Sequence, residues 1–151
     1  MSKPLKLIAQ SDTDIAVISS LLQDCTMKIG DIAWVPGEHR FAFVGNRYQW
    51  EKKRLFRRPK GGRVRVAFHA SGISNAQLYN IDMQDSETVL DLLNIEAEKT
   101  EADEGTADTA GYTLLLNFSG GAAIRLQTET IDAVATDLGE SWEAIARPAH
   151  D

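Results

Sequence analysis

The sequence predicts an α+β domain in which a mostly antiparallel β-sheet packs against one main N-terminal helix, residues 12–25. Two observations support this prediction. One segment repeats apolar residues at helical spacing, while most later segments alternate with the two-residue period of a strand. The later connections have hairpin length, whereas parallel strands need long crossovers. With 151 residues, 43% of them hydrophobic and 25% charged, the chain is expected to form a single domain, residues 1–151.

The predicted helix begins at a capping sequence. Ser11 is followed three positions later by Asp14, which is the spacing of a capping box. Apolar residues then recur at i, i+3, i+7 and i+10, so that one face of the helix is apolar. These residues are Ile15, Ile18, Leu22 and Cys25.

Five short stretches in the first 83 residues are typical of strands, because apolar residues alternate in them. Both faces of the third stretch are largely apolar, which predicts a strand near the middle of the sheet. Pro36 and Gly37, which precede it, have the residue types that a type II turn prefers. The five stretches are residues 5–8, 32–34, 40–50, 63–69 and 79–83.

The second half contains the strongest strand pattern, a hairpin over residues 112–128 whose turn is Ser119, Gly120 and Gly121. Before it, Ser86 is expected to cap a short helix over residues 86–93, followed by a strand over 95–99. Residues 131–138 fit either a strand or a helix. The segments around the two predicted helix starts are similar, which suggests a weak internal duplication.

The charge of the chain is divided between two opposed segments. Residues 47–65, the basic segment, contain nine Lys or Arg and one acid, for a net +8, and residues 82–108 contain ten acids and one Lys, for a net −9. The whole chain has a net charge of −6. Within the acidic part, residues 101–111 have almost no apolar side chains and are expected to form a mobile loop. Such segregation determines what the surface attracts, but it specifies no reaction.

The basic segment is the candidate binding site, with its hairpin, residues 52–65, as the contact surface. Cations interleaved with aromatic residues can contact phosphates and stack on bases, so nucleic acid is one expected partner. An acidic protein is another, and a purely structural or solubilising role is a third interpretation. The candidate residues are Trp50, Lys52, Lys53, Arg54, Arg57, Arg58, Lys60, Arg63 and Arg65.

Other residue types give little support for catalysis. His39, His69 and His150 are isolated, and no paired cysteines accompany them, so neither a metal site nor a cofactor is expected. Cys25 is expected to be a buried apolar residue. A non-enzymatic binding domain is therefore the leading hypothesis. A small-molecule site or enzyme lined by aromatics such as Trp34 and Trp50 is the alternative, and self-association through the basic and acidic segments is another.

The expected location is the cytoplasm, without membrane attachment. The N-terminus lacks the apolar stretch of a secretory signal, and no apolar run approaches the roughly 20 residues that span a bilayer. A single cysteine, Cys25, cannot form an internal disulfide, which agrees with a reducing compartment.

Two longer stretches carry a resemblance to a known family. They are DIAWVPGEHRFAFVGNRYQWE and LLLNFSGGAAIRLQTETIDAVATDLGESW. They resemble a family of small bacterial, mainly alphaproteobacterial, proteins catalogued as a domain of unknown function, number twenty-nine forty-eight in that series. The resemblance extends over most of the chain and implies a lineage and a one-domain layout. It implies no activity, cofactor or partner.

Overall fold

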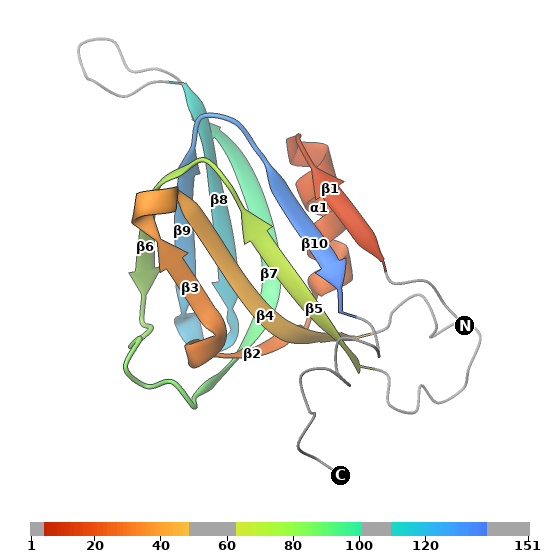
Figure 1. Ribbon diagram of the computed structural model, residues 1–151, viewed down its shortest axis with the longest axis vertical. Coiled ribbons are helices and arrows are strands. Elements are labelled where there is room, and N and C mark those ends of the chain that lie inside the picture. The colour runs from red at the N-terminus through yellow and green to blue at the C-terminus, as the bar shows by residue number, and fades with distance from the viewer. Residues whose placement is uncertain (1–4, 49–62, 101–109, 139–151) are drawn as a thin grey trace.

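The computed structural model describes residues 5–48, 63–100 and 110–138. These residues form ten strands in one antiparallel sheet, together with one α-helix near the N-terminus (Figure 1). The predicted α+β class is therefore confirmed. The helix is α1 (Asp12–Leu22), and the strands are β1 (Lys6–Ala9), β2 (Thr26–Lys28), β3 (Ile32–Val35), β4 (Arg40–Tyr48), β5 (Arg63–Ala70), β6 (Ile73–Tyr79), β7 (Val89–Thr100), β8 (Gly111–Phe118), β9 (Ala123–Thr128) and β10 (Ala133–Asp137).

The sheet bends so that its two halves face each other. Its strand order is β1-β10-β5-β4-β2-β7-β8-β9-β6, and β3 pairs with β4 beside this path. In Figure 1 the strands β1, β10, β5, β4 and β3 form a front layer, and β7, β8, β9 and β6 form a back layer. The short strand β2 pairs with both β4 and β7 and joins the two layers.

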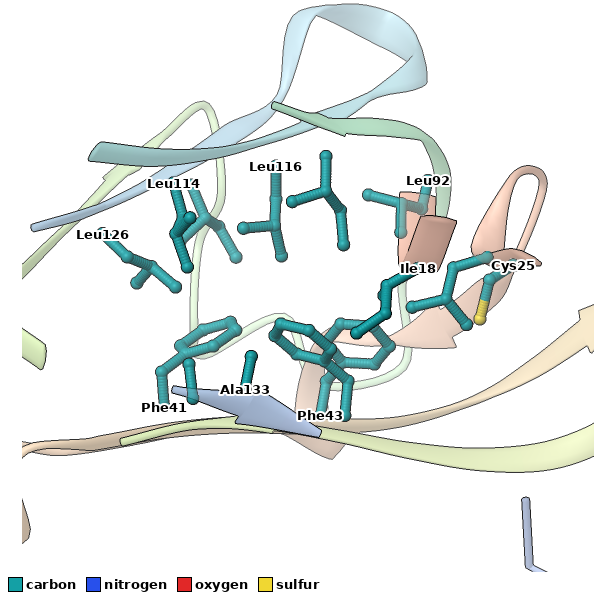
Figure 2. Packing of buried hydrophobic residues seen from close by; sticks show 14 of the residues in the cluster. Ile18, Cys25, Phe41, Phe43, Leu92, Leu114, Leu116, Leu126 and Ala133 are labelled. Atoms are coloured by element: carbon teal, nitrogen blue, oxygen red, sulfur yellow. The ribbon is translucent and has the colours of Figure 1, made fainter. Parts of the chain in front are cut away.

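The hydrophobic core lies between the layers. Figure 2 shows Leu114, Leu116 and Leu126 of the back layer facing Phe41 and Phe43 of the front layer. These five side chains are almost fully buried, and Phe43 also stacks on Phe68 with 5.2 Å between ring centroids. Packing of such side chains is the main source of folding free energy.

Helix α1 begins as predicted and closes the side of the core next to β7. The hydroxyl of Ser11 accepts a hydrogen bond from the Asp14 backbone N–H at 3.1 Å. The hydroxyl of Ser19 accepts one from the Ile95 backbone N–H of β7 at 2.9 Å. The helix ends at Leu22 instead of residue 25, because Asp24 takes a left-handed conformation with φ of 63°.

Strand β4 occupies the middle of the front layer, as its two apolar faces predicted, and pairs with β3, β5 and β2. Gly45 is required where β2 approaches it. A Cβ atom there would lie 2.6 Å from the Thr26 carbonyl oxygen and 2.9 Å from the Cys25 sulfur. Only a residue without a side chain allows this close approach.

The predicted helix over residues 86–93 is wrong. The residues from Val89 onward belong to β7, in which Leu90 and Leu92 point into the core while Val89 and Leu93 are exposed. The run of apolar residues fits both the 3.6-residue period of a helix and the two-residue period of a strand. Pairing with β2 on one side and β8 on the other favours the strand. The suggested duplication fails for the same reason, because the first similar segment is a helix and the second becomes a strand.

Three smaller predictions also need correction. The strand expected over 79–83 lies earlier, at Ile73–Tyr79, and Met83 is exposed. Pro36–Glu38 forms a 3-10 turn followed by His39 with φ of 51°, instead of a type II turn. The C-terminal boundary predicted for the mobile loop, residue 111, is too late, because Gly111 is the first residue of β8 and pairs with Thr100. Residues 101–109 of the expected loop lie outside the described residues.

The last ambiguity is settled in favour of a strand. Within 131–138, residues Ala133–Asp137 form β10, which inserts between β1 and β5. The hairpin over 112–128 is confirmed as β8 and β9, and its turn contains Gly120 and Gly121 with φ of 78° and 85°.

Candidate functional site

The candidate site lies where β4 ends and β5 begins. The two strands pair in an antiparallel register in which Tyr48 is opposite Arg63 and Asn46 is opposite Arg65. Of the candidate residues, only Arg63 and Arg65 fall within the described part of the chain. The other seven, which leave from and return to this pair of strand ends, lie outside it: Trp50, Lys52, Lys53, Arg54, Arg57, Arg58 and Lys60.

Arg63 is exposed and held in a defined orientation. Its Nη1 donates hydrogen bonds to the backbone carbonyl of Asp24 at 3.0 Å and to that of Asn46 at 3.2 Å. Its guanidinium carbon lies 5.3 Å from the centre of the Tyr48 ring, within the range of a cation–π contact. Arg63 is exposed, and within the described residues no hydrogen bond uses its Nε or Nη2, so these donors are available to an anion.

Arg65 is half-buried and belongs to a polar row on the same face. The row crosses β5, β4, β2 and β7 and consists of Arg65, Asn46, Thr26 and Asp91. The backbone carbonyl of Arg65 accepts a hydrogen bond from the Leu138 N–H at 2.8 Å, which continues the pairing beyond β10. Arg63 and Arg65 therefore lie on one face, two residues apart on the same strand.

Arg47, the first cation of the basic segment, has a structural role. Its side chain has 0% exposure, and it points to the opposite face from Arg63. Its Nε and Nη2 donate to the two carboxylate oxygens of Asp137 at 2.7 and 2.8 Å, and its Nη1 donates to the Tyr48 carbonyl at 3.0 Å. The charge of Arg47 is thus neutralised inside the protein and does not contribute to a binding surface.

This ion pair could not be predicted from the sequence, because Arg47 and Asp137 are 90 residues apart. Asp137 also accepts a hydrogen bond from the Leu5 N–H at 3.1 Å. The pair therefore connects β4, β10 and the start of β1 across the intervening strand β5. The only available sequence signal was local: Arg47 falls at the inward position of a strand whose other inward residues are Phe41, Phe43 and Gly45.

The strand ends that lead into the acidic loop are distant from the basic site. Residues 101–109 connect Thr100 of β7 to Gly111 of β8, which pair with each other. In Figure 1 these ends of β7 and β8 lie at the top of the molecule, whereas Tyr48 and Arg63 are at the lower ends of β4 and β5. The attachment points of residues 101–109 and of the basic segment are therefore separated along the longest axis.

The other residues singled out from the sequence have structural positions. Trp34 lies opposite Phe41 and packs against the core, and Trp50 lies outside the described residues. His39 occupies the turn before β4, as expected, with its Nδ1 3.2 Å from the Ile73 carbonyl oxygen. His69 lies on the outward face of β5. His150 lies outside the described residues.

Cys25 is fully buried beside Gly45, as an apolar residue would be. Burial raises the pKa of its thiol to about 12, although the nearby charges of Arg63 and Arg47 act to lower it. A thiol that remains protonated is a poor nucleophile. Cys25 is therefore inert in the folded protein.

Two further findings concern only residues 5–48, 63–100 and 110–138. No three His, Cys, Asp or Glu side chains are close enough together there to hold a metal ion. The helix in that part of the chain is too short and too polar to cross a membrane.

Comparison with known proteins gives one match. Neither the curated proteins nor the solved structures include a significant match to this chain. The model of the family described as "Protein of unknown function (DUF2948)" matches residues 5–150, which is nearly the whole chain. The chain therefore belongs to the DUF2948 family, as the resemblance of its sequence implied.

Proposed function

We propose that this protein is a non-enzymatic binding domain of the cytoplasm that uses the basic segment to contact an acidic partner or a polyanion. The observation that carries the proposal is the arrangement of Arg63. Its guanidinium is exposed, fixed by two backbone carbonyls and by the Tyr48 ring, and located where the remaining cations of the segment leave the sheet. A positioned arginine loses little conformational entropy when it binds a carboxylate or a phosphate.

The local charge supports the same proposal. Without the neutralised Arg47, residues 48–65 contain eight Lys or Arg and one acid, a net charge of +7 within 18 residues. The buried Asp137 is already used by Arg47, and the acidic loop is attached at the other end of the molecule. A concentrated positive charge of this kind attracts anions even when the whole protein is acidic.

The alternative of a small-molecule site has less support. Trp34 was one of its two named aromatic residues, and it packs against the core beside Phe41. Self-association between the basic segment and the acidic loop of a second copy has a specific observation in its favour, because their attachment points lie at opposite ends of the molecule. That arrangement permits head-to-tail contacts between copies.

Fluorescence anisotropy with a labelled single-stranded RNA and a labelled polyglutamate peptide tests the proposal. Binding of RNA should weaken with salt, and neutralising about five phosphates of a single strand gives a slope of log K against log salt of about −3.5. The variant in which Arg54, Arg57 and Arg58 are all changed to Glu should abolish binding of either probe.

The matched control changes Lys6, Lys99 and Arg125 to Glu. These three side chains are exposed, lie outside the candidate site and alter the net charge by the same amount. The control should retain most of the binding. Failure of both probes to bind at about 50 mM salt, or equal losses in the two triple variants, would contradict the proposal.

A further inference from the structure

The outward face of the front layer has a charge-free centre. Residues paired across the layer form rows that run from β1 to β4, and the first of them continues to β3. Apart from Lys6 on the edge strand β1, the two central rows contain no Lys, Arg, Asp or Glu. The first row is Ile8, Val134, His69, Ala42 and Ala33. The second row is Lys6, Thr136, Ala67 and Val44.

Nothing in the described part of the chain covers this face. In Figure 1 it is turned toward the viewer, and no helix or strand lies in front of it. Two large apolar side chains at its margins are open to solvent: Ile8 is 56% exposed on β1, and Val35 is 39% exposed on β3. A contiguous apolar surface of this kind commonly marks an interaction site.

The back layer shows that an apolar outward face is not a general property of this sheet. There the corresponding row across β7, β8, β9 and β6 is Glu96, Leu115, Arg125 and Gln77. It contains charges of both signs, as expected for a face in contact with water. The outward face of the front layer therefore differs in composition from its counterpart in the same molecule.

His69 places a polar side chain at the centre of the apolar face. It lies at the centre of the first row, between Ala42 and Val134. Its Nδ1 is buried and has no hydrogen-bond partner within the described residues. The imidazole therefore carries an unsatisfied polar atom at a position where the neighbouring residues of the row are apolar.

We propose that a second copy of this chain packs on this face, sheet against sheet. The two central rows are composed mainly of small side chains, which suits the spacing of about 10 Å between stacked sheets. A second copy presents the same apolar face, so that one contact removes both from water. The central rows of this face lie outside the basic segment, although Arg63 and Arg65 border them, and the proposal does not depend on the proposed function.

The charges at the two ends of the face determine how the copies can be arranged. Arg63 and Arg65 lie at one end, where β5 begins. Glu38, Arg40 and Asp132 lie at the other, where β4 and β10 begin, and Arg40 is 4.0 Å from Glu38. The first end carries a charge of +2 and the second −1. If the positive end of one copy lies over the negative end of the other, unlike charges come close. If the same ends lie over each other, the two +2 ends repel.

The size of the face predicts a weak dimer. Five strands spaced about 4.8 Å apart and four outward rows spaced about 7 Å apart give roughly 400 Å² per copy, or about 800 Å² in total. Specific stable interfaces bury about 1,200–2,000 Å², so the expected dissociation constant is micromolar or weaker.

Sedimentation velocity on the full-length chain from about 1 to 500 µM tests the proposal. The protein should change from monomer to dimer within this range. Val44→Glu places a carboxylate in the second central row of each copy and should weaken the dimer at least tenfold. The matched control is Leu115→Glu, a half-buried residue on a central strand of the back layer, and it should dimerise like the unaltered protein.

A gain-of-binding variant decides the question if Val44→Glu does not fold. His69→Leu removes the unpartnered nitrogen and adds apolar surface at the centre of the face, so it should tighten the dimer several-fold. A chain that remains monomeric throughout the range overturns the proposal, and the occupant of the face is then another protein or another part of the same chain. A dimer that Val44→Glu leaves intact also overturns it.

Discussion

Removing one partner of the Arg47–Asp137 ion pair should destabilise the protein strongly. Asp137 accepts two hydrogen bonds from the Arg47 guanidinium and one from the Leu5 N–H. Asp137→Ala would leave a fully buried arginine without its counter-charge. Breaking a buried pair from one side costs on the order of 3–5 kcal/mol of unfolding free energy. For a chain of this length, that corresponds to a fall in melting temperature of roughly 6–20 °C.

Removing both partners together should cost much less. The double variant Arg47→Met with Asp137→Leu replaces two desolvated charges with apolar side chains, and such replacements are often neutral. We therefore expect the double variant to be more stable than either single variant, with a coupling energy of at least about 3 kcal/mol. Urea denaturation of the four proteins of this double-mutant cycle measures that energy.

The exposed ion pair between Lys28 and Glu87 provides the control. Its atoms are 3.1 Å apart, but the two side chains are 52% and 81% exposed. Its coupling energy, measured with the same substitutions to Met and Leu, should be below about 1 kcal/mol because water screens it. Two results would refute the argument that burial makes the Arg47–Asp137 pair important. One is a loss of under about 1 kcal/mol of unfolding free energy in each single variant, and the other is a double variant in which the two losses simply add.

The remaining predictions concern the core and the buried thiol. Leu116→Ala should lower the free energy of unfolding by about 2–5 kcal/mol, as measured by urea titration, because the side chain is fully buried between the layers; a loss under about 1 kcal/mol would contradict this placement. Gly45→Ala should lower the melting temperature markedly, because the added methyl group would meet the Thr26 carbonyl oxygen at 2.6 Å; an unchanged melting temperature would show that β2 shifts freely. The Cys25 thiol has a pKa of about 12 when folded and 9.0 as its ordinary value, so its contribution to stability is fully present below pH 9 and is lost as the pH rises toward 12. The unfolding free energy of the unaltered protein, measured relative to that of Cys25→Ala, should therefore fall by about 1.4 kcal/mol per pH unit above pH 9. A difference that does not depend on pH would contradict this prediction.

Local physical chemistry was enough to predict several elements from the sequence. The start of α1 follows from Ser11 and Asp14, whose capping interaction involves residues three positions apart. The β8–β9 hairpin follows from alternating leucines on either side of Gly120 and Gly121, which readily adopt positive φ. The division of the chain into basic and acidic segments is a property of composition and needs no structure.

Elements whose pattern fitted two structures were decided by pairing with distant strands. Residues 89–94 contain enough apolar residues for a helix or a strand, and β2 and β8 on either side select the strand. Residues 133–137 were equally ambiguous until β1 and β5 paired with them. Sequence-local propensity is worth tenths of a kcal/mol per residue, so such contacts readily override it.

The role of each charge was likewise decided by tertiary structure. Arg47 and Arg63 belong to the same run of cations, yet the alternation of β4 and the pairing of β5 place one inside against Asp137 and the other outside against Tyr48. The uncovered apolar face was not visible in the sequence either, since its rows combine residues from five strands. The sequence by itself determined where helices and hairpins can begin and how the charge is distributed. Only the tertiary structure decided which side chains share a face, because that depends on the register between strands far apart in the chain.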